Sequence, residues 1–219
     1  MRRSAFLLKI DRRTVDRKLI YLAKKAQQRH QDFLQKLKSK VTSLQFDDLI
    51  TSEHTKMKPL TLSVAVDGDR RTILSAKVGR IPAFGLLADR SRQKYGPRVN
   101  DHQKTLKAMF EEIGPTIAPT ALVQSDEHPR YPEFVNRYLP GREYRRHPGG
   151  RGTIAGQGEL KKKHYDPIFI LNHSCAMFRA NLNRLIRKTW CTTKRAERLQ
   201  MHIDIFIDFY NRIYLPTKA

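Results

Sequence analysis

The spacing of apolar residues changes from a helical period to a strand-like period near residue 40. Before that point, residues 4–10 and 12–23 predict two helices separated by a tight turn at Ile10–Asp11. The second helix has one apolar face, built from residues that recur at helical spacing: Val15, Leu19 and Leu22. Residues 24–40 continue as a polar helix that connects this head to the rest of the chain.

Beyond residue 40, segments rich in Val, Ile, Leu and Thr predict strands. An Asp-Gly pair in "DGDR" is typical of a tight hairpin between the second and third of them. A helix over 100–114 carries an apolar stripe, has Asn100 or Asp101 as its cap and ends at Gly114. Residues 82–98 are expected to be irregular. The other predicted elements are strands at 42–48, 60–68, 71–81 and 120–126, a short helix at 131–141, a basic strand that begins at 142, and helices at 168–189 and 194–214.

The order of these elements indicates a fold class. Three strands, a helix, a fourth strand, a short helix, a fifth strand and two final helices form the ribonuclease-H-like α/β pattern. We therefore expect a mixed five-stranded sheet flanked by helices. The predicted domains are an N-terminal helical segment at 1–40 and the sheet-containing core at 41–219.

Composition narrows the class of partner. The 219 residues include 43 Lys and Arg against 21 Asp and Glu, a formal net charge of +22. Such a charge favours polyanions, because cationic side chains neutralise phosphates and release counterions. The sequence has no long apolar run and no signal peptide, and only two cysteines, so a membrane span, a disulfide framework and a thiolate zinc cluster are excluded. A reducing cytoplasm is the expected compartment.

The charge is distributed unevenly. Residues 1–40 hold 13 basic and 3 acidic side chains, and residues 140–219 hold 16 and 6. The middle segment, 41–139, is nearly balanced, with 14 basic and 12 acidic residues. A protein that coats nucleic acid uniformly does not need this arrangement. The arrangement suits an acidic central site to which the basic flanking segments present DNA or RNA.

The N-terminal helices have the pattern of the second half of a helix-turn-helix. In that motif the recognition helix offers polar and basic residues near its N-terminus to bases and phosphates. The alternative is a basic amphipathic helix that packs on the core. On the first interpretation the chain begins inside the motif. The candidate DNA contacts are Arg12, Arg13, Thr14, Arg17 and Lys18.

Two carboxylates carry the candidate chemistry. Asp47 ends the first predicted strand, beside Asp48, and Asp126 ends the fourth. If these strands are neighbours in the sheet, the two side chains meet at the same edge. Paired carboxylates suit Mg²⁺ or Mn²⁺ in a two-metal site, which activates the attacking oxygen and stabilises the leaving oxygen of phosphodiester transfer. The alternative is that these residues are ordinary strand-end and turn aspartates.

Four stretches carry a family resemblance: "LLKIDRRTVDRKLIYLA", "QFDDLITSEHTKMKPLTLSVAVD", "LVQSDEHPRYPEFVNRYLPG" and "LNHSCAMFRANLNRLIRKTWCTTKRAERLQMHIDIFIDFYNR". They resemble bacterial insertion-sequence transposases of the DDE type, and "RLIRKTWCTTK" is the most specific piece. The resemblance implies that Asp47 and Asp126 are the first two acids and that Asp48 is a neighbouring acid. It also implies metal-dependent cleavage and strand transfer on double-stranded DNA, in the bacterial nucleoid, by a homodimer.

The third acid of that family does not match. Its glutamate should precede "RANLNRLIRKT", where this chain has Asn172 and His173. His173 is the better metal donor of the two, and Asp166 lies half a dozen residues upstream. A helix-capping or core role for His173, in a degraded site, is the alternative.

Further basic residues are candidate phosphate contacts: Arg145, Arg146, Arg184, Arg187 and Lys188. The second candidate function is a transposase remnant that binds DNA without cutting it. A ribosome-associated RNA-binding protein is a third, which would explain the charge but not the two strand-end acids.

Overall fold

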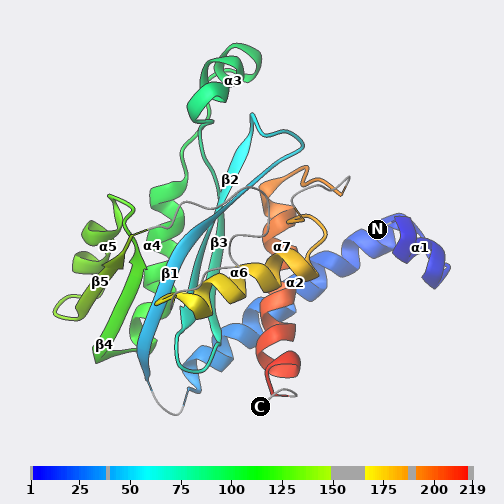
Figure 1. The fold of residues 1–219 in the computed structure, drawn as a ribbon. Coiled ribbons are helices and arrows are strands. Elements are labelled where there is room, and N and C mark those ends of the chain that lie inside the picture. Colours follow the sequence, from blue (N-terminus) through cyan, green and yellow to red (C-terminus); the bar gives the residue numbers. More distant parts are fainter. Residues whose placement is uncertain (1, 38–39, 149–165, 187–190, 217–219) are drawn as a thin grey trace.

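The computed structural model describes residues 2–37, 40–148, 166–186 and 191–216 (Figure 1). A single five-stranded sheet lies between helices on both of its faces. Its strands are β1 (Val41–Ser52), β2 (Pro59–Asp67), β3 (Ile73–Arg80), β4 (Ile117–Asp126) and β5 (Glu143–His147). The α-helices are α1 (Arg2–Leu8), α2 (Arg12–Gln35), α3 (Ala88–Tyr95), α4 (His102–Ile113), α5 (Tyr131–Tyr138), α6 (Phe169–Asn181) and α7 (Ala196–Phe209). Two short 3-10 helices are η1 (Gly85–Leu87) and η2 (Gly114–Thr116), and a π-helical segment, η3 (Tyr210–Tyr214), follows α7.

The strand order confirms the predicted fold class. The sheet runs β3-β2-β1-β4-β5. β1, β2 and β3 pair antiparallel, whereas β4 is parallel to both β1 and β5. This mixed sheet, with the antiparallel hairpins first and the parallel strands added on the other side of β1, is the ribonuclease-H-like arrangement. It makes β1 the central strand.

Each face of the sheet has its own core. Leu44 and Phe46 of β1 point toward α4 and α5 and pack with Phe110, whose stripe on α4 is buried as predicted. Leu49 and the alternate residues of β2 pack against α6 and α7. Because side chains alternate along a strand, neighbouring residues of β1 serve different cores. Asp47 and Asp48 are therefore divided between the two faces.

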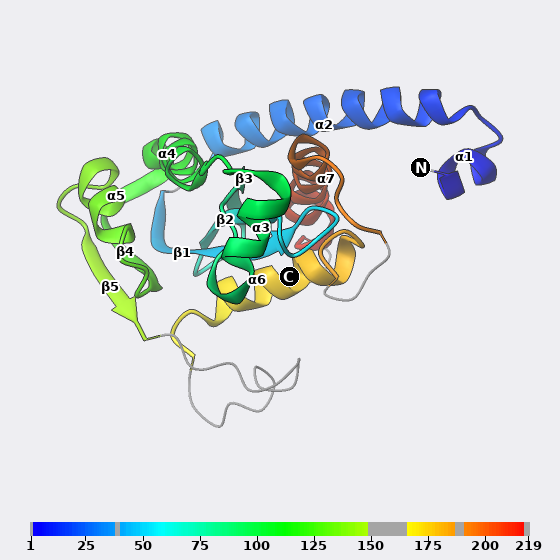
Figure 2. The ribbon, with the colours of Figure 1, turned by 90° about the horizontal axis from the view of Figure 1, so that it is seen from above.

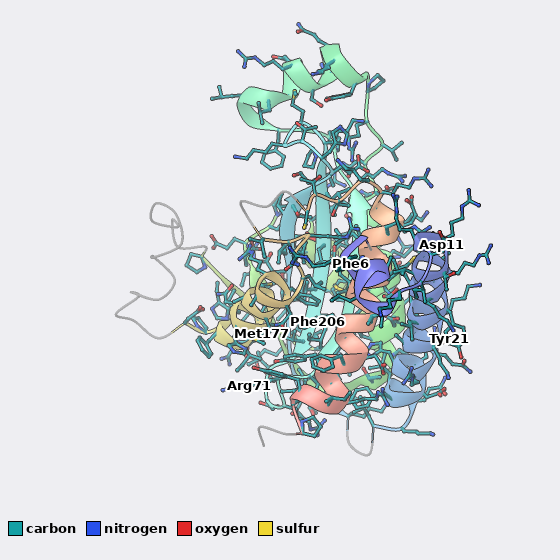
Figure 3. The ribbon with its side chains drawn as sticks, turned by 90° about the vertical axis from the view of Figure 1, so that its right-hand side faces the viewer. Phe6, Asp11, Tyr21, Arg71, Met177 and Phe206 are labelled. Carbon is teal, nitrogen blue, oxygen red and sulfur yellow. The ribbon has the colours of Figure 1, made fainter. Side chains whose placement is uncertain are left out.

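α2 begins at Arg12 as predicted, after a turn that Asp11 caps by accepting a hydrogen bond from Arg13 N at 2.7 Å, whereas α1 begins at Arg2, two residues before the predicted start. α2 runs across the molecule beside α7 (Figure 2), where Gln27 donates to Asp204 at 2.6 Å. Its buried face is Leu19, Ala23, Ala26, His30 and Leu34. The predicted inclusion of Leu22 in this face is wrong, since 45% of that side chain is exposed. Small alanines mark the packed face because they allow α2 to approach α7 closely. Figure 3 shows Phe6 and Tyr21, with Asp11 at the corner between α1 and α2.

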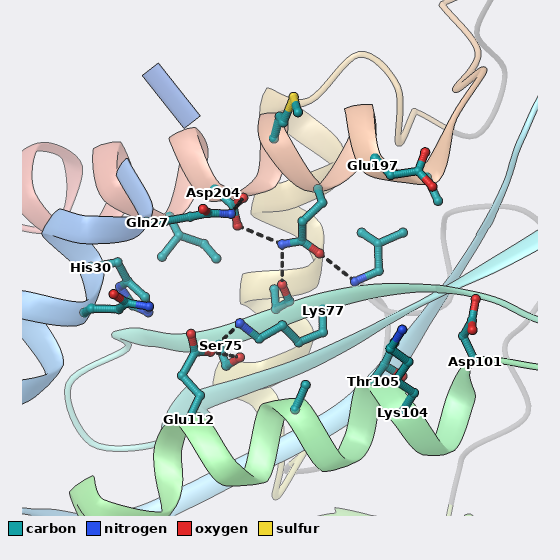
Figure 4. Close-up of a pocket in the computed structure, with 18 of the residues that line it drawn as sticks. Gln27, His30, Ser75, Lys77, Asp101, Lys104, Thr105, Glu112, Glu197 and Asp204 are labelled. Carbon is teal, nitrogen blue, oxygen red and sulfur yellow. Dashed lines mark hydrogen bonds and ion pairs between the residues drawn. The ribbon is translucent and has the colours of Figure 1, made fainter. Parts of the chain in front are cut away.

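The outer edge of β3 is covered by side chains rather than by another strand (Figure 4). Gln200 of α7 accepts from Val78 N at 2.8 Å and donates to Ala76 O at 2.9 Å. Asn211 binds both backbone groups of Ile73 in the same way, at 3.0 and 2.8 Å. These amides replace the backbone of a missing strand, which protects an edge that would otherwise pair with other chains.

Two expectations about helices are corrected. Residues 82–98 contain α3, which projects from the body at the top of Figure 1, instead of an irregular stretch. α6 ends at Asn181 and does not extend to residue 189. Within the described residues, no helix has the length and apolar character that crossing a membrane requires.

Candidate active site

Asp47 and Asp126 are brought together by the parallel pairing of β1 and β4. Gln45 lies opposite Gln124 in this register, and both aspartates lie two residues further along their strands. A two-residue step returns the side chain to the same face of the sheet, so both carboxylates point to the α6 side. Burial, followed by the charge of Asp126, raises the pKa of Asp47 to about 7. The negative charge of Asp126 therefore disfavours ionisation of Asp47.

Asp48 faces the other side of the sheet and is fully supplied with donors. Its Oδ1 accepts hydrogen bonds from Thr61 Oγ1 at 2.8 Å and Ser63 Oγ at 2.5 Å. Its Oδ2 lies 2.5 Å from His102 Nε2 and 2.8 Å from Tyr131 Oη. Burial raises the pKa of Asp48, but the hydrogen bonds and the charge of His102 outweigh burial, so the pKa is lowered overall. Asp48 is thus an ionised structural carboxylate.

Aromatic rings hold this network in place. His102 opens α4, and its ring lies 5.0 Å from that of His128, which lies 4.7 Å from the ring of Tyr131. Tyr131 is completely buried at the start of α5. Burial and the neighbouring carboxylates raise its pKa far above the ordinary value, so its hydroxyl keeps the proton. A neutral hydroxyl is what two adjacent carboxylates need as a donor.

Tyr131 also connects the two aspartates. Its Oη lies 3.1 Å from Asp47 Oδ1 in addition to the shorter contact with Asp48. A tyrosine has one O–H, so it donates to one carboxylate at a time. Asp47 Oδ1 also accepts from Asp48 N at 2.6 Å. Both hydrogen bonds of Asp47 use Oδ1, and Oδ2 accepts none from the described residues.

A chain of amides beside the carboxylate pair fixes the start of α6. Gln45 donates to Gln124 Oε1 at 3.3 Å and to Pro167 O at 3.1 Å, and it accepts from Leu171 N at 3.0 Å. Gln124 in turn contacts His147 Nε2 at 3.1 Å. His147 is opposite Asp126 in the β4–β5 register. These contacts join three strands and one helix at the level of the site.

The three candidates for the third ligand lie on or just before α6. Asp166 accepts hydrogen bonds from Ile168 N at 3.1 Å and from Asn172 Nδ2 at 2.8 Å. Two of the candidates, Asp166 and Asn172, therefore bind each other. The His173 ring lies 6.1 Å from that of Phe169. Burial and then the charge of Arg71, on the hairpin between β2 and β3, lower its pKa. Its Nδ1 is buried and has no hydrogen-bond partner among the described residues. No described contact joins any of the three to Asp47 or Asp126, and no cluster of three His, Cys, Asp or Glu suited to a metal occurs within the described ranges.

The predicted DNA contacts occupy three separate regions. At the start of α2, Thr14 is half-buried, and the cations there, Arg12, Arg13, Arg17 and Lys18, are exposed. Arg145 and Arg146 are exposed on β5, where Arg145 pairs with Glu143. Arg184, after α6, donates to Thr192 O at 3.2 Å. Arg187 and Lys188 lie outside the described residues.

Sequence reasoning missed the residues that surround Asp48. His102 and Tyr131 are the first residues of α4 and α5, a position where a polar side chain is easily taken for a cap. "SDEHPRY" does place His128 and Tyr131 within five residues of Asp126, which is a signal that local spacing offered. His102 had no such signal, because it reaches Asp48 only through the packing of α4 on the sheet.

Comparisons with known proteins yield structural likenesses alone. No family model and no curated protein matches the chain. Among solved structures, the catalytic domain of the Mos1 mariner transposase is 12% identical, with 94% of this chain and 95% of that chain covered and a TM-score of 0.29. A structure of that domain with raltegravir and Mn is 10% identical, with 89% and 92% covered and a TM-score of 0.28. A third, with raltegravir and Mg, is 10% identical, with 89% and 93% covered and a TM-score of 0.29. Because TM-scores below 0.5 do not establish a shared fold, the fold assignment rests on the strand order of the sheet.

Proposed function

We propose that this chain is a DNA transposase core that hydrolyses and transfers phosphodiester bonds with Mg²⁺ or Mn²⁺. The observation that carries the proposal is the position of Asp47 and Asp126 at the same level of two adjacent parallel strands, with the pKa of Asp47 raised by burial and by Asp126. Two like charges in a partly buried site are costly unless a cation joins them. The proposed substrates are the double-stranded ends of a bacterial insertion sequence and its target in the nucleoid.

The two carboxylates fit a hard divalent cation, which prefers oxygen ligands. Asp47 and Asp126 would hold it through carboxylate oxygens, and His173 is the proposed third ligand. Asp47 Oδ2 accepts no hydrogen bond from the described residues, so it is available for coordination. When bound, the metal supplies Lewis acidity that activates the attacking oxygen and stabilises the leaving one.

Other residues hold Asp47 in position or attract DNA to the site. Tyr131 and the Asp48 backbone hold Asp47 Oδ1, so the free oxygen of Asp47 keeps a fixed direction. Exposed cations at the start of α2 and on β5 favour phosphates in the surrounding DNA. The N-terminal helices would act as part of a helix-turn-helix, and two copies of the chain would assemble on DNA.

The test is metal-dependent cleavage of supercoiled plasmid and of end-bearing DNA. Asp47→Asn and Asp126→Asn should each reduce the Mn²⁺-dependent rate by more than about a hundredfold, since even the supporting partners of metal ligands cost 10–100-fold. Asp89→Asn, on the projecting α3, is the matched control and should cleave normally. Cleavage that persists unchanged in Asp47→Asn would exclude this site.

A transposase remnant that binds DNA without cutting it is the second candidate. It is favoured by the absence, among the described residues, of a third metal donor beside Asp47 and Asp126. On this alternative the wild-type chain binds end-bearing DNA but shows no Mn²⁺-dependent cleavage, and Asp47→Asn binds equally well.

A further inference from the structure

A groove lies along β1 beyond the point where its parallel partner stops. β4 ends at Asp126, and β1 continues to Ser52. Within the described residues, the next pairing on that side of β1 is a single bridge between Glu53 and Thr193. A cavity of about 690 Å³ occupies this region and is lined by five of the six residues from Asp48 to Glu53. Since alternate residues face opposite sides of a sheet, a lining that includes successive residues follows the edge of the strand.

The groove presents positive charge to a ligand. Its cations are Arg179 of α6, Arg184 and Lys56, which come from different elements around it. Its two carboxylates are already compensated. Glu53 pairs with Arg98 at 3.1 Å, and Asp48 has the four donors described above. The charge left for a ligand therefore favours phosphates.

Apolar residues also line the groove. They include Phe84, just before η1, and Leu87 at its end, and 63% of Phe84 is exposed. An exposed aromatic beside cations is the combination that binds single-stranded nucleic acid, because a base stacks on the ring while the backbone contacts the cations. Bases in a duplex are stacked on their neighbours, so only an unpaired base can reach Phe84.

We infer that this groove binds unpaired nucleotides of the DNA strand that enters the Asp47–Asp126 site. The inference rests on the proposed function, because it uses DNA as the substrate and because the groove begins at Asp48, the residue that follows Asp47 on β1. Phosphates lie on Arg179, Arg184 and Lys56, and one base stacks on Phe84. The volume of about 690 Å³ is in the range of about 300–1,000 Å³ that holds small ligands.

Binding of fluorescent DNA, measured by anisotropy in EDTA, tests this directly. The probes are a blunt duplex, the same duplex with a four-nucleotide 3′ tail, and the same duplex with a 5′ tail. Wild type should bind one tailed duplex at least about fivefold more tightly than the blunt one, and Phe84→Ala should abolish that preference while leaving blunt-duplex affinity within about twofold. Arg179→Ala and Lys56→Ala should each lower the salt slope for the tailed duplex by about 0.7.

Matched controls separate the groove from general effects. Phe209→Ala removes an exposed aromatic from α7, and Arg137→Ala removes a cation from α5. Both should keep the tail preference. Equal affinity of wild type for blunt and tailed duplexes, or an unchanged preference in Phe84→Ala, would overturn the inference.

Failure of the proposed function gives a different result. If the chain does not cleave DNA, the tail preference still appears in EDTA and in Asp47→Asn, because neither the metal nor Asp47 contacts the groove ligand. If the groove inference alone fails, Asp47-dependent cleavage persists without any tail preference.

Discussion

Two adjacent aspartates of β1 occupy opposite environments. Asp48, on the α4 side, has four hydrogen-bond donors and a lowered pKa. Asp47, on the α6 side, is raised to a pKa of about 7 by burial and by Asp126. Both are the same residue type, in the same strand, one position apart. The difference follows from the alternation of side chains across the sheet, which gives each aspartate a different set of neighbours.

Asp48 has the environment of a structural acid, and Asp47 has that of a functional one. A buried carboxylate that satisfies its own charge stabilises the fold and has little capacity left for a ligand. A buried carboxylate next to another is destabilising until a cation arrives, which is a common property of functional sites. The "FDD" sequence therefore contains a structural acid, Asp48, and a candidate functional acid, Asp47. Mutations at Asp48 and at Asp47 should change stability in opposite directions.

Asp48→Ala should have the largest effect on stability. The substitution leaves His102, Tyr131, Thr61 and Ser63 without their shared acceptor in a buried setting. A buried donor left without an acceptor costs about 1–3 kcal/mol, so losing the acceptor of four donors should cost about 3 kcal/mol or more of unfolding free energy. Urea denaturation at pH 7 measures the change, with Asp89→Ala on the exposed α3 as the control. A loss below about 1 kcal/mol would show that Asp48 is not the anchor of this network.

Asp47→Asn should stabilise the metal-free chain in a pH-dependent manner. The folded-state pKa of Asp47 is raised from 3.8 to about 7, so the folded chain binds more protons than the unfolded chain between these values. Stability is therefore lost as pH rises from about 4 to about 7, and the neutral Asn avoids that loss. We expect a gain on the order of 2 kcal/mol at pH 8 and almost none at pH 4.

Thermal unfolding in EDTA at both pH values measures this effect. Asp126→Asn should give a gain of the same sign at pH 8, because it removes the charge that repels Asp47. A destabilised Asp47→Asn at pH 8 would contradict the idea that this carboxylate is strained by its neighbour.

How much of this was predictable follows from the range of the interactions. The order of elements along the chain follows from local patterns, such as the change of period near residue 40, and Asp47 and Asp126 lie in the predicted first and fourth strands. Asp47 does not end its strand as predicted, because β1 continues to Ser52. The environment of Asp48 does not follow from local patterns, because Thr61, Ser63 and His102 approach it through strand register and helix packing. α3 was missed because "ADRSRQKY" has no apolar stripe and buries only Ser91. Leu22 was misassigned because helical periodicity alone does not show which of two faces packs on α7.

Tyr131→Phe should have the smallest effect on stability but a specific effect on the metal. Asp48 keeps three of its four donors, so the loss of one buried hydrogen bond costs about 1 kcal/mol. Asp47 loses its only described side-chain donor, and loss of such a supporting contact typically lowers metal affinity by about 10–100-fold. Titration with Mn²⁺, followed by the electron paramagnetic resonance signal of the free ion, measures the affinity. Tyr138→Phe, on the same helix, is the control, because no hydrogen bond of its hydroxyl is described. A Tyr131→Phe protein that binds Mn²⁺ as tightly as wild type would mean that Asp47 is held by the backbone of Asp48 alone. The hydroxyl of Tyr131 would then support only Asp48, and the metal affinity of Asp47 would not depend on the hydrogen bonds around Asp48.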